Sequence, residues 1–165
     1  MSGLPPPRLP ETSRALPGFG AAGLALVEDP SNGPKARCQP VRAEPAPRCY
    51  EIDGPDRWAE LAGRYQLDVT NSRRPDWWRV TGWAGPWLIP DYAAVAADYD
   101  AVHLTVLGYL TTAGLAVPAG RDGARTVLAG WAPDATWWLA DLLSDSGPAT
   151  DWVLGRRDPL WTQVT

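Results

Sequence analysis

Residues 75–110 read PDWWRVTGWAGPWLIPDYAAVAADYDAVHLTVLGYL and hold four of the ten tryptophans, three of the five tyrosines and the sole histidine, His103. We expect the rest of the fold to be built on this stretch, because its aromatic and aliphatic side chains supply much of the apolar surface available for burial. A hairpin is indicated over residues 77–89, where Ala84 and Gly85 form a short connection between two β-prone runs.

A helix is predicted to begin at Asp91. Pro90 suits the first turn of a helix, and the carboxylate of Asp91 complements the positive end of the helix dipole. The positions i, i+3, i+4 and i+7 are then occupied by Tyr92, Val95, Ala96 and Tyr99. This spacing gives the helix one apolar face.

A strand is predicted over residues 101–106. Successive side chains of a strand point to opposite faces, so Val102, Leu104 and Val106 share one face. His103 and Thr105 then lie on the other face, either in a second packed layer or at a cleft.

The composition changes sharply near residue 48. Ten of the eighteen prolines precede it, whereas every Trp and Tyr follows it. A segment rich in Pro, Gly, Ser and Arg buries too little apolar surface to offset the entropy of ordering. We therefore predict a disordered Pro- and Gly-rich tail at residues 1–47 and a single Trp-rich domain at residues 48–165, with the tail dispensable for folding.

The charge distribution argues against a general nucleic-acid binder. Residues 49–165 carry nine Arg against fifteen Asp and Glu, whereas phosphate-backbone binding needs clustered Lys and Arg. No run approaches the roughly 20 apolar residues that span a bilayer, and no signal peptide is evident. Cys38 and Cys49 have neither disulfide-framework nor metal-ligand spacing. We predict a cytoplasmic protein.

The rest of the chain supplies further predicted elements. They are a strand at residues 49–52, a helix over 55–66, a loop over 68–76, strands at 115–118 and 124–131, and a segment at 136–143 that fits a strand or a helix. Hairpins mixed with helices are typical of the α+β class. We predict a small mixed or antiparallel sheet with two main helices.

His103 is the first candidate for chemistry. A histidine beside Thr105 can act as a general base when a carboxylate orients it, and Asp134 completes the candidate catalytic set. A hydrogen-bonded histidine in a half-buried layer is the structural alternative. No metal site is predicted, because His103 is the sole His and no clustered Asp motif is present.

The tryptophans suggest a binding surface. In an adjacent pair such as Trp77 and Trp78, or Trp137 and Trp138, one strand-borne ring enters the core and the other meets a second layer or solvent. A planar ligand or a protein partner could contact the outer rings. The candidate ligand-binding residues are Trp78, Trp83, Trp87, Trp137, Arg73 and Arg74. Alternatively, the rings only fill the core.

Three features resemble parts of the layout of small ADP-ribosyltransferase-like domains: a strand near residues 48–50, the H-x-T of His103 and Thr105, and an acidic residue, Asp134, before a strand. That family's pattern has the H-x-T on the first strand and a glutamate near the end, whereas here the H-x-T comes late and no E-x-E exists. The resemblance implies a transferase with NAD as cofactor.

Two classes of function follow from the sequence. The favoured one is a binding or accessory domain that recognises a partner protein or a planar ligand through a Trp-rich surface, without a cofactor. The alternative is a small transferase that acts on a nucleotide-like substrate around His103, with NAD. A soluble domain with a single His and no catalytic motif offers little catalytic machinery, which favours binding.

Overall fold

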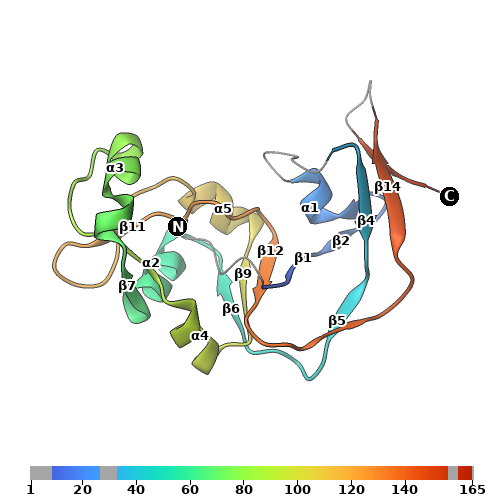
Figure 1. The fold of residues 1–165 in the computed structure, drawn as a ribbon, viewed down its shortest axis with the longest axis horizontal. Coiled ribbons are helices and arrows are strands. Elements are labelled where there is room, and N and C mark those ends of the chain that lie inside the picture. The colour runs from blue at the N-terminus through green and yellow to red at the C-terminus, as the bar shows by residue number, and fades with distance from the viewer. Residues whose placement is uncertain (1–8, 27–32, 156–159, 165) are drawn as a thin grey trace.

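The computed structural model describes residues 9–26, 33–155 and 160–164. Figure 1 shows a central sheet, formed by β1, β12, β9 and β6, with helices beside it, and a second β layer on the right. Helices and mainly antiparallel strands mix along the chain, so the α+β class predicted from the sequence is confirmed.

The four-stranded sheet has the order β1-β12-β9-β6. The strands are β1 (Glu11–Ser13), β6 (Cys49–Ile52), β9 (Ala101–Leu104) and β12 (Ala135–Trp138). β6 runs parallel to β9, while β12 is antiparallel to both β9 and β1. The strands predicted at residues 49–52 and from residue 101 are confirmed. The first residues of the segment 136–143, which fitted a strand or a helix, belong to strand β12.

Five helices occur among the described residues: α1 (Ala22–Ala25), α2 (Pro55–Arg64), α3 (Thr70–Thr81), α4 (Tyr92–Asp98) and α5 (Val106–Thr112). α2 and α4 match the predicted helices. Pro55 begins α2, and the Asp91 carboxylate accepts a hydrogen bond from the Ala93 N–H at the start of α4. Four helices have at least seven residues, so the prediction of two main helices is not confirmed.

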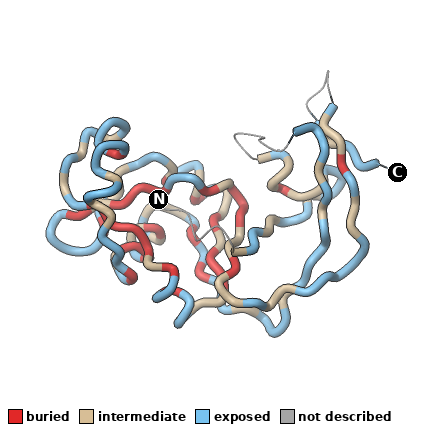
Figure 2. The backbone as a smooth tube through the Cα atoms, in the orientation of Figure 1, coloured by how far each residue is buried: buried red, intermediate tan, exposed pale blue. Residues whose placement is uncertain are grey.

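The main core lies where the sheet meets α2 and α4. Tyr50, Ile52, Val102 and Leu104 cover one face of the sheet and are at most 2% exposed. Trp58 and Leu61 from α2 and Val95 from α4 pack against them and are also almost completely buried. Figure 2 shows the buried residues concentrated in this part of the molecule.

The hairpin expected over residues 77–89 is wrong. Residues 70–81 form α3, and Gly82 at φ +70° ends it in the left-handed conformation that favours glycine. The Asp68 carboxylate accepts a hydrogen bond from the backbone N–H of Thr70, and the Thr70 hydroxyl accepts one from the backbone N–H of Trp87. These two bonds start α3 inside the segment expected to be a loop, and Pro75 is accommodated within the helix.

The remaining strands are short. They are β2 (Ala15–Leu16), β3 (Gly20–Ala21), β4 (Lys35–Cys38), β5 (Val41–Ala43), β7 (Gln66–Asp68), β8 (Leu88–Pro90), β10 (Val117–Pro118), β11 (Arg125–Thr126), β13 (Leu143–Asp145), β14 (Thr150–Leu154) and β15 (Trp161–Gln163). β4 pairs with β14, which also pairs with β15, and β5 pairs with β13. These five strands are the second β layer.

The N-terminal segment is ordered where the structure describes it, which corrects the expectation of a disordered tail for residues 9–26 and 33–47. β1 pairs with β12, and the second β layer contains β4 and β5. Residues 1–8 and 27–32 lie outside the described residues. Backbone pairing with strands after residue 134 supplies the stabilisation that this composition lacks on its own. Independent folding of residues 48–165 stays a prediction.

Val95 tests the face of α4. Val95→Asp should unfold the protein, because an unpaired buried charge costs several kcal/mol against a total stability of about 5–15 kcal/mol. Ala94→Asp is the matched control, because Ala94 is exposed on the same helix. Urea unfolding followed by circular dichroism compares the two. Cooperative unfolding of Val95→Asp close to wild type would contradict the core assignment.

Candidate functional site

A row of polar side chains crosses the sheet on the face away from the main core. Glu51, His103, Thr136 and Thr12 are direct register partners on β6, β9, β12 and β1. Partners in register project to the same face of a sheet. His103 therefore lies on one face of β9, and Val102 and Leu104 lie on the other face, as the alternation predicted.

His103 is half-buried in the row. Its Nδ1 lies 2.8 Å from the Thr136 hydroxyl oxygen, which fixes the ring orientation. Burial lowers the pKa of His103, while the charges of Asp134 and Glu51 oppose this shift and that of Arg14 adds to it. The imidazole is therefore neutral at pH 7. A neutral imidazole near two carboxylates can accept a proton.

Asp134 is the buried carboxylate beside the row, 1% exposed. It accepts hydrogen bonds from the Arg14 N–H at 3.0 Å and from Arg14 Nε at 2.6 Å, and it forms an ion pair with the same guanidinium. Burial alone would raise the pKa of Asp134, but the hydrogen bonds and charge of Arg14 together lower it. Arg14 thus holds Asp134 ionised.

Thr105 has a different position from the one expected. β9 ends at Leu104, and the Thr105 hydroxyl accepts the Gly108 N–H at 2.9 Å as the N-cap of α5. The same hydroxyl donates to the Ile52 carbonyl at 3.3 Å. The first interaction caps α5 and the second holds its start against β6. The Thr105 hydroxyl therefore has a structural role and does not belong to the polar row.

The predicted ligand-binding tryptophans are not on one surface. Trp87 is completely buried, and six of the ten tryptophans are buried, four of them in the two core clusters. Trp137 is half-buried and packs against Trp131, with ring centroids 6.1 Å apart. Trp78 is 53% exposed on α3, where Arg73 and Arg74 also lie. Trp83 is half-buried under the Arg125 guanidinium, 4.2 Å from its ring centroid.

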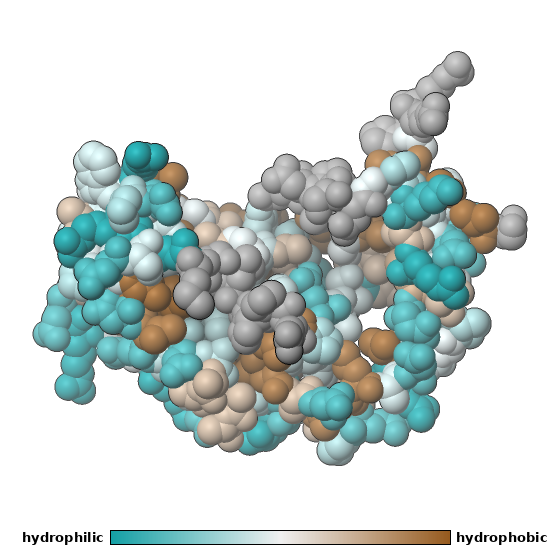
Figure 3. Space-filling view, viewed as in Figure 1, coloured by the Kyte–Doolittle hydropathy of each residue, from teal (hydrophilic) through white to brown (hydrophobic). Residues whose placement is uncertain are grey.

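A cleft of about 710 Å³ separates β1 and the β2–β3 pair from the second β layer. Figure 3 shows a hollow between the four-stranded sheet with its helices and the second β layer. The wall combines Glu11, Thr12, Arg37, Gln39, Trp152 and Gln163. Thr12 belongs to this interlayer cleft and also to the polar row, because it is the register partner of Thr136.

The described residues give two further limits. They contain no group of three or more His, Cys, Asp or Glu placed to hold a metal ion. Within the same ranges, no helix is long and apolar enough to span a bilayer.

Sequence reasoning missed Arg14, Thr136 and Trp152. Arg14 lies in the segment expected to be disordered, so nothing in the sequence linked it to Asp134. Thr136 had a signal, because the alternation in TWWL puts it and Trp138 on one face, but its pairing with His103 needs the sheet register. Trp152 lies where the sequence pattern weakens.

A scan against protein-family models and searches of curated proteins and of solved structures gave no match to this chain. The α+β fold, the polar row and the interlayer cleft are therefore the basis for assigning a function.

The Arg14–Asp134 pair should stabilise the protein in a pH-dependent way. Arg14→Ala removes the Nε bond and the ion pair, and we expect a loss of about 1–3 kcal/mol at pH 7. Because the pKa of Asp134 is lowered, this contribution is complete above the ordinary aspartate value of 3.8 and is lost as the pH falls through the folded-state pKa.

Urea denaturation of wild type and Arg14→Ala at pH 7, 5 and 3 measures this difference. Arg42→Ala is the control, since Arg42 pairs with Glu44 at 3.4 Å and both side chains are exposed. We expect that change to stay within about 0.5 kcal/mol. Equal losses in the two variants would mean that the buried carboxylate does not depend on Arg14.

Proposed function

We propose that this protein is a binding module that holds a small planar ligand with polar groups in the interlayer cleft. The observation that carries the proposal is the cleft itself. Its volume of about 710 Å³ is within the range of about 300–1,000 Å³ that is usual for small-molecule sites.

The wall of the cleft offers both an aromatic surface and hydrogen-bonding groups. Trp152 contributes an indole that is 8% exposed, and its Nε1 donates to the Thr150 hydroxyl. A Cβ on Gly20 would lie 2.9 Å from this ring, so glycine allows β3 to pack against it. A planar ligand would extend this aromatic packing.

Two charged residues at the cleft favour a ligand with polar substituents. Arg37 lines the cleft with a 73% exposed side chain, and its guanidinium lies 3.9 Å from the Asp151 carboxylate. Glu11 is exposed as a residue, yet partial desolvation of its carboxyl raises its pKa. Thr12, whose hydroxyl accepts the Trp138 Nε1–H, adds a neutral polar group to the lining. A ligand with an acceptor near Arg37 and a donor near Glu11 fits this arrangement.

Arg37→Gln tests ligand binding in the cleft. We expect saturable quenching of intrinsic tryptophan fluorescence by at least one of three planar probes, AMP, NAD or nicotinamide. The affinity for that probe should fall about tenfold in Arg37→Gln, the loss of one charge-assisted hydrogen bond. Arg42→Gln makes the same charge change on exposed β5 and should bind within twofold of wild type.

The proposal fails if none of the three probes gives saturable quenching up to millimolar concentration. It also fails if Arg37→Gln and Arg42→Gln weaken binding equally, because the effect would then be one of net charge. Thermal melts of both variants confirm that folding is unchanged.

A second candidate function, a transferase acting on a nucleotide-like substrate, is favoured by His103. Its ring is oriented by Thr136 and lies near the carboxylates of Asp134 and Glu51. This arrangement supports general-base chemistry on a substrate hydroxyl or water. Thr105 would not take part, because its hydroxyl caps α5.

His103→Ala tests the transferase. If His103 is catalytic, the stability of His103→Ala should stay within about 1 kcal/mol of wild type. Its consumption of NAD, measured as the release of nicotinamide, should disappear. A stability loss of about 1–3 kcal/mol through the unpaired Thr136 hydroxyl, with no NAD consumption by wild type, would leave His103 as a structural residue. Neither result affects the cleft, which Arg37→Gln tests.

A further inference from the structure

A second group of aromatic and basic residues lies where α3 meets β11, away from the interlayer cleft. It consists of Arg73, Trp77, Trp83, Trp87 and Arg125, and we name it the arginine–tryptophan cluster. Trp77 and Trp87 are buried and meet edge to face with ring centroids 5.1 Å apart. Trp83 packs against this pair from the outside.

Arg73 lies on the inner face of α3. Residues four apart on a helix share a face, so Arg73 lies between Val69 and Trp77, which both pack in the cluster. The backbone fixes this placement, because the Val69 N–H donates to the Trp87 carbonyl at 3.0 Å. The Arg73 Nε and Nη2 atoms are consequently buried.

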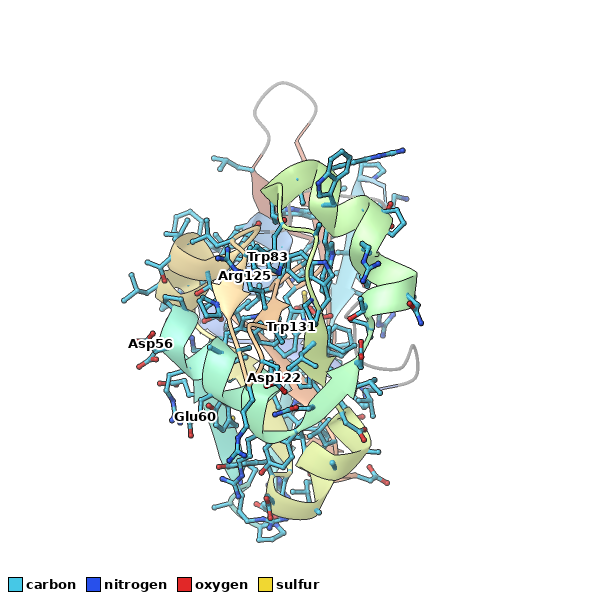
Figure 4. The ribbon with its side chains drawn as sticks, turned by 90° about the vertical axis from the view of Figure 1, so that its left-hand side faces the viewer. Asp56, Glu60, Trp83, Asp122, Arg125 and Trp131 are labelled. Carbon is cyan, nitrogen blue, oxygen red and sulfur yellow. The ribbon has the colours of Figure 1, made fainter. Side chains whose placement is uncertain are left out.

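Arg125 enters the cluster from β11. Its backbone N–H donates to the Pro86 carbonyl at 3.0 Å, and Trp87 and Arg125 form a parallel bridge. Its guanidinium lies over the Trp83 ring, and Figure 4 shows Trp83 and Arg125 side by side. A Cβ on Gly85 would lie 2.6 Å from the Trp83 ring, so glycine allows the loop to pass this close.

The cluster has N–H donors without acceptors. Arg73 Nε and Nη2, Trp83 Nε1 and Trp87 Nε1 are buried, and none of them makes a hydrogen bond to a residue that the structure describes. Of the six ion pairs found in the described part of the chain, none includes Arg73 or Arg125. Buried donors without partners are costly, and a guanidinium costs more than a neutral group.

We propose that the arginine–tryptophan cluster binds an oxyanion, the phosphate or carboxylate group of a ligand. Such a group has only acceptor atoms, which matches a donor-only set, and arginine is suited to bind it with two parallel N–H bonds. Arg73 would supply the positive charge that balances it, and Arg125, whose guanidinium lies over the Trp83 ring, adds a second positive charge to the cluster. The acidic net charge of −4 makes this local basic surface an exception within the protein.

Arg74 provides the matched control. It lies next to Arg73 on α3 and carries the same charge, but its side chain is exposed. A net-charge effect would respond equally to the loss of either arginine. A site built by Arg73 responds only to the loss of Arg73.

Thermal melts and tryptophan-fluorescence titrations with sodium phosphate, sodium acetate and sodium chloride at matched ionic strength test the site. We expect phosphate or acetate, but not chloride, to raise the Tm of wild type and to saturate. Arg73→Gln and Arg125→Gln should each weaken that binding at least tenfold, and Arg74→Gln should stay within twofold. The oxyanion that saturates at lower concentration identifies the preferred group.

Three outcomes would overturn the proposal. One is a wild type that responds alike to all three salts. Another is equal weakening in Arg73→Gln and Arg74→Gln. The third is an Arg73→Gln protein that is more stable than wild type in chloride and in phosphate alike, which would make Arg73 an unpaired buried cation only. If Arg73→Gln does not fold, the oxyanion affinities of Arg125→Gln and Arg74→Gln are compared instead. Equal weakening in these two variants would also overturn the proposal. Arg37→Gln, which tests the cleft, should leave oxyanion binding unchanged.

Discussion

The buried carboxylate of Asp134 links Arg14, near the start of the described chain, to the beginning of β12. Asp134 adopts φ +63°, a conformation that is rare outside glycine, immediately before β12 begins. The main-chain N–H and the side chain of Arg14 hold it there, and β1 pairs with β12 beside it. The start of β12 determines which residue faces His103. The contact between Thr136 and His103 therefore depends on the interaction of Arg14 with Asp134, two residues that are 120 positions apart in the sequence.

The choice of tryptophan as the main aromatic filler has a polar consequence. The chain contains one Phe, one Met and ten Trp, and each buried indole brings an N–H group away from solvent. Nearby threonine hydroxyls accept two of these, from Trp138 and Trp152. Among the residues that the structure describes, Trp58, Trp87 and Trp131 have no such acceptor. A phenylalanine core would bury similar apolar area without these unpaired donors.

Local patterns predicted the elements that local interactions determine. α2 and α4 have a proline or aspartate at the start and apolar residues at helical spacing, and β6 and β9 alternate clearly. α3 was missed because its sequence has almost no apolar periodicity. It forms because Thr70 bonds to Trp87, a contact 17 residues away that no local pattern contains.

The N-terminal strands were missed for a similar reason. Their proline-rich composition cannot form stable structure alone, and pairing with β12, β13 and β14 makes up for this. Of the candidate site, alternation correctly predicted that His103 faces away from the core. The partners of His103 come from register, and Arg14 comes from the segment that composition predicted to be disordered. A site assembled across strands requires the tertiary fold before its members can be named.

The polar row and the interlayer cleft share one side chain, Thr12. Its hydroxyl accepts the Trp138 Nε1–H at 2.8 Å, which leaves its own proton free to donate. Through the sheet register Thr12 is adjacent to Thr136, and Thr136 contacts His103. A group bound at the β1 edge of the cleft is thus two strands from the imidazole. The two proposed sites, the interlayer cleft and the surroundings of His103, therefore lie on neighbouring strands of one sheet, with β1 at the edge of the cleft.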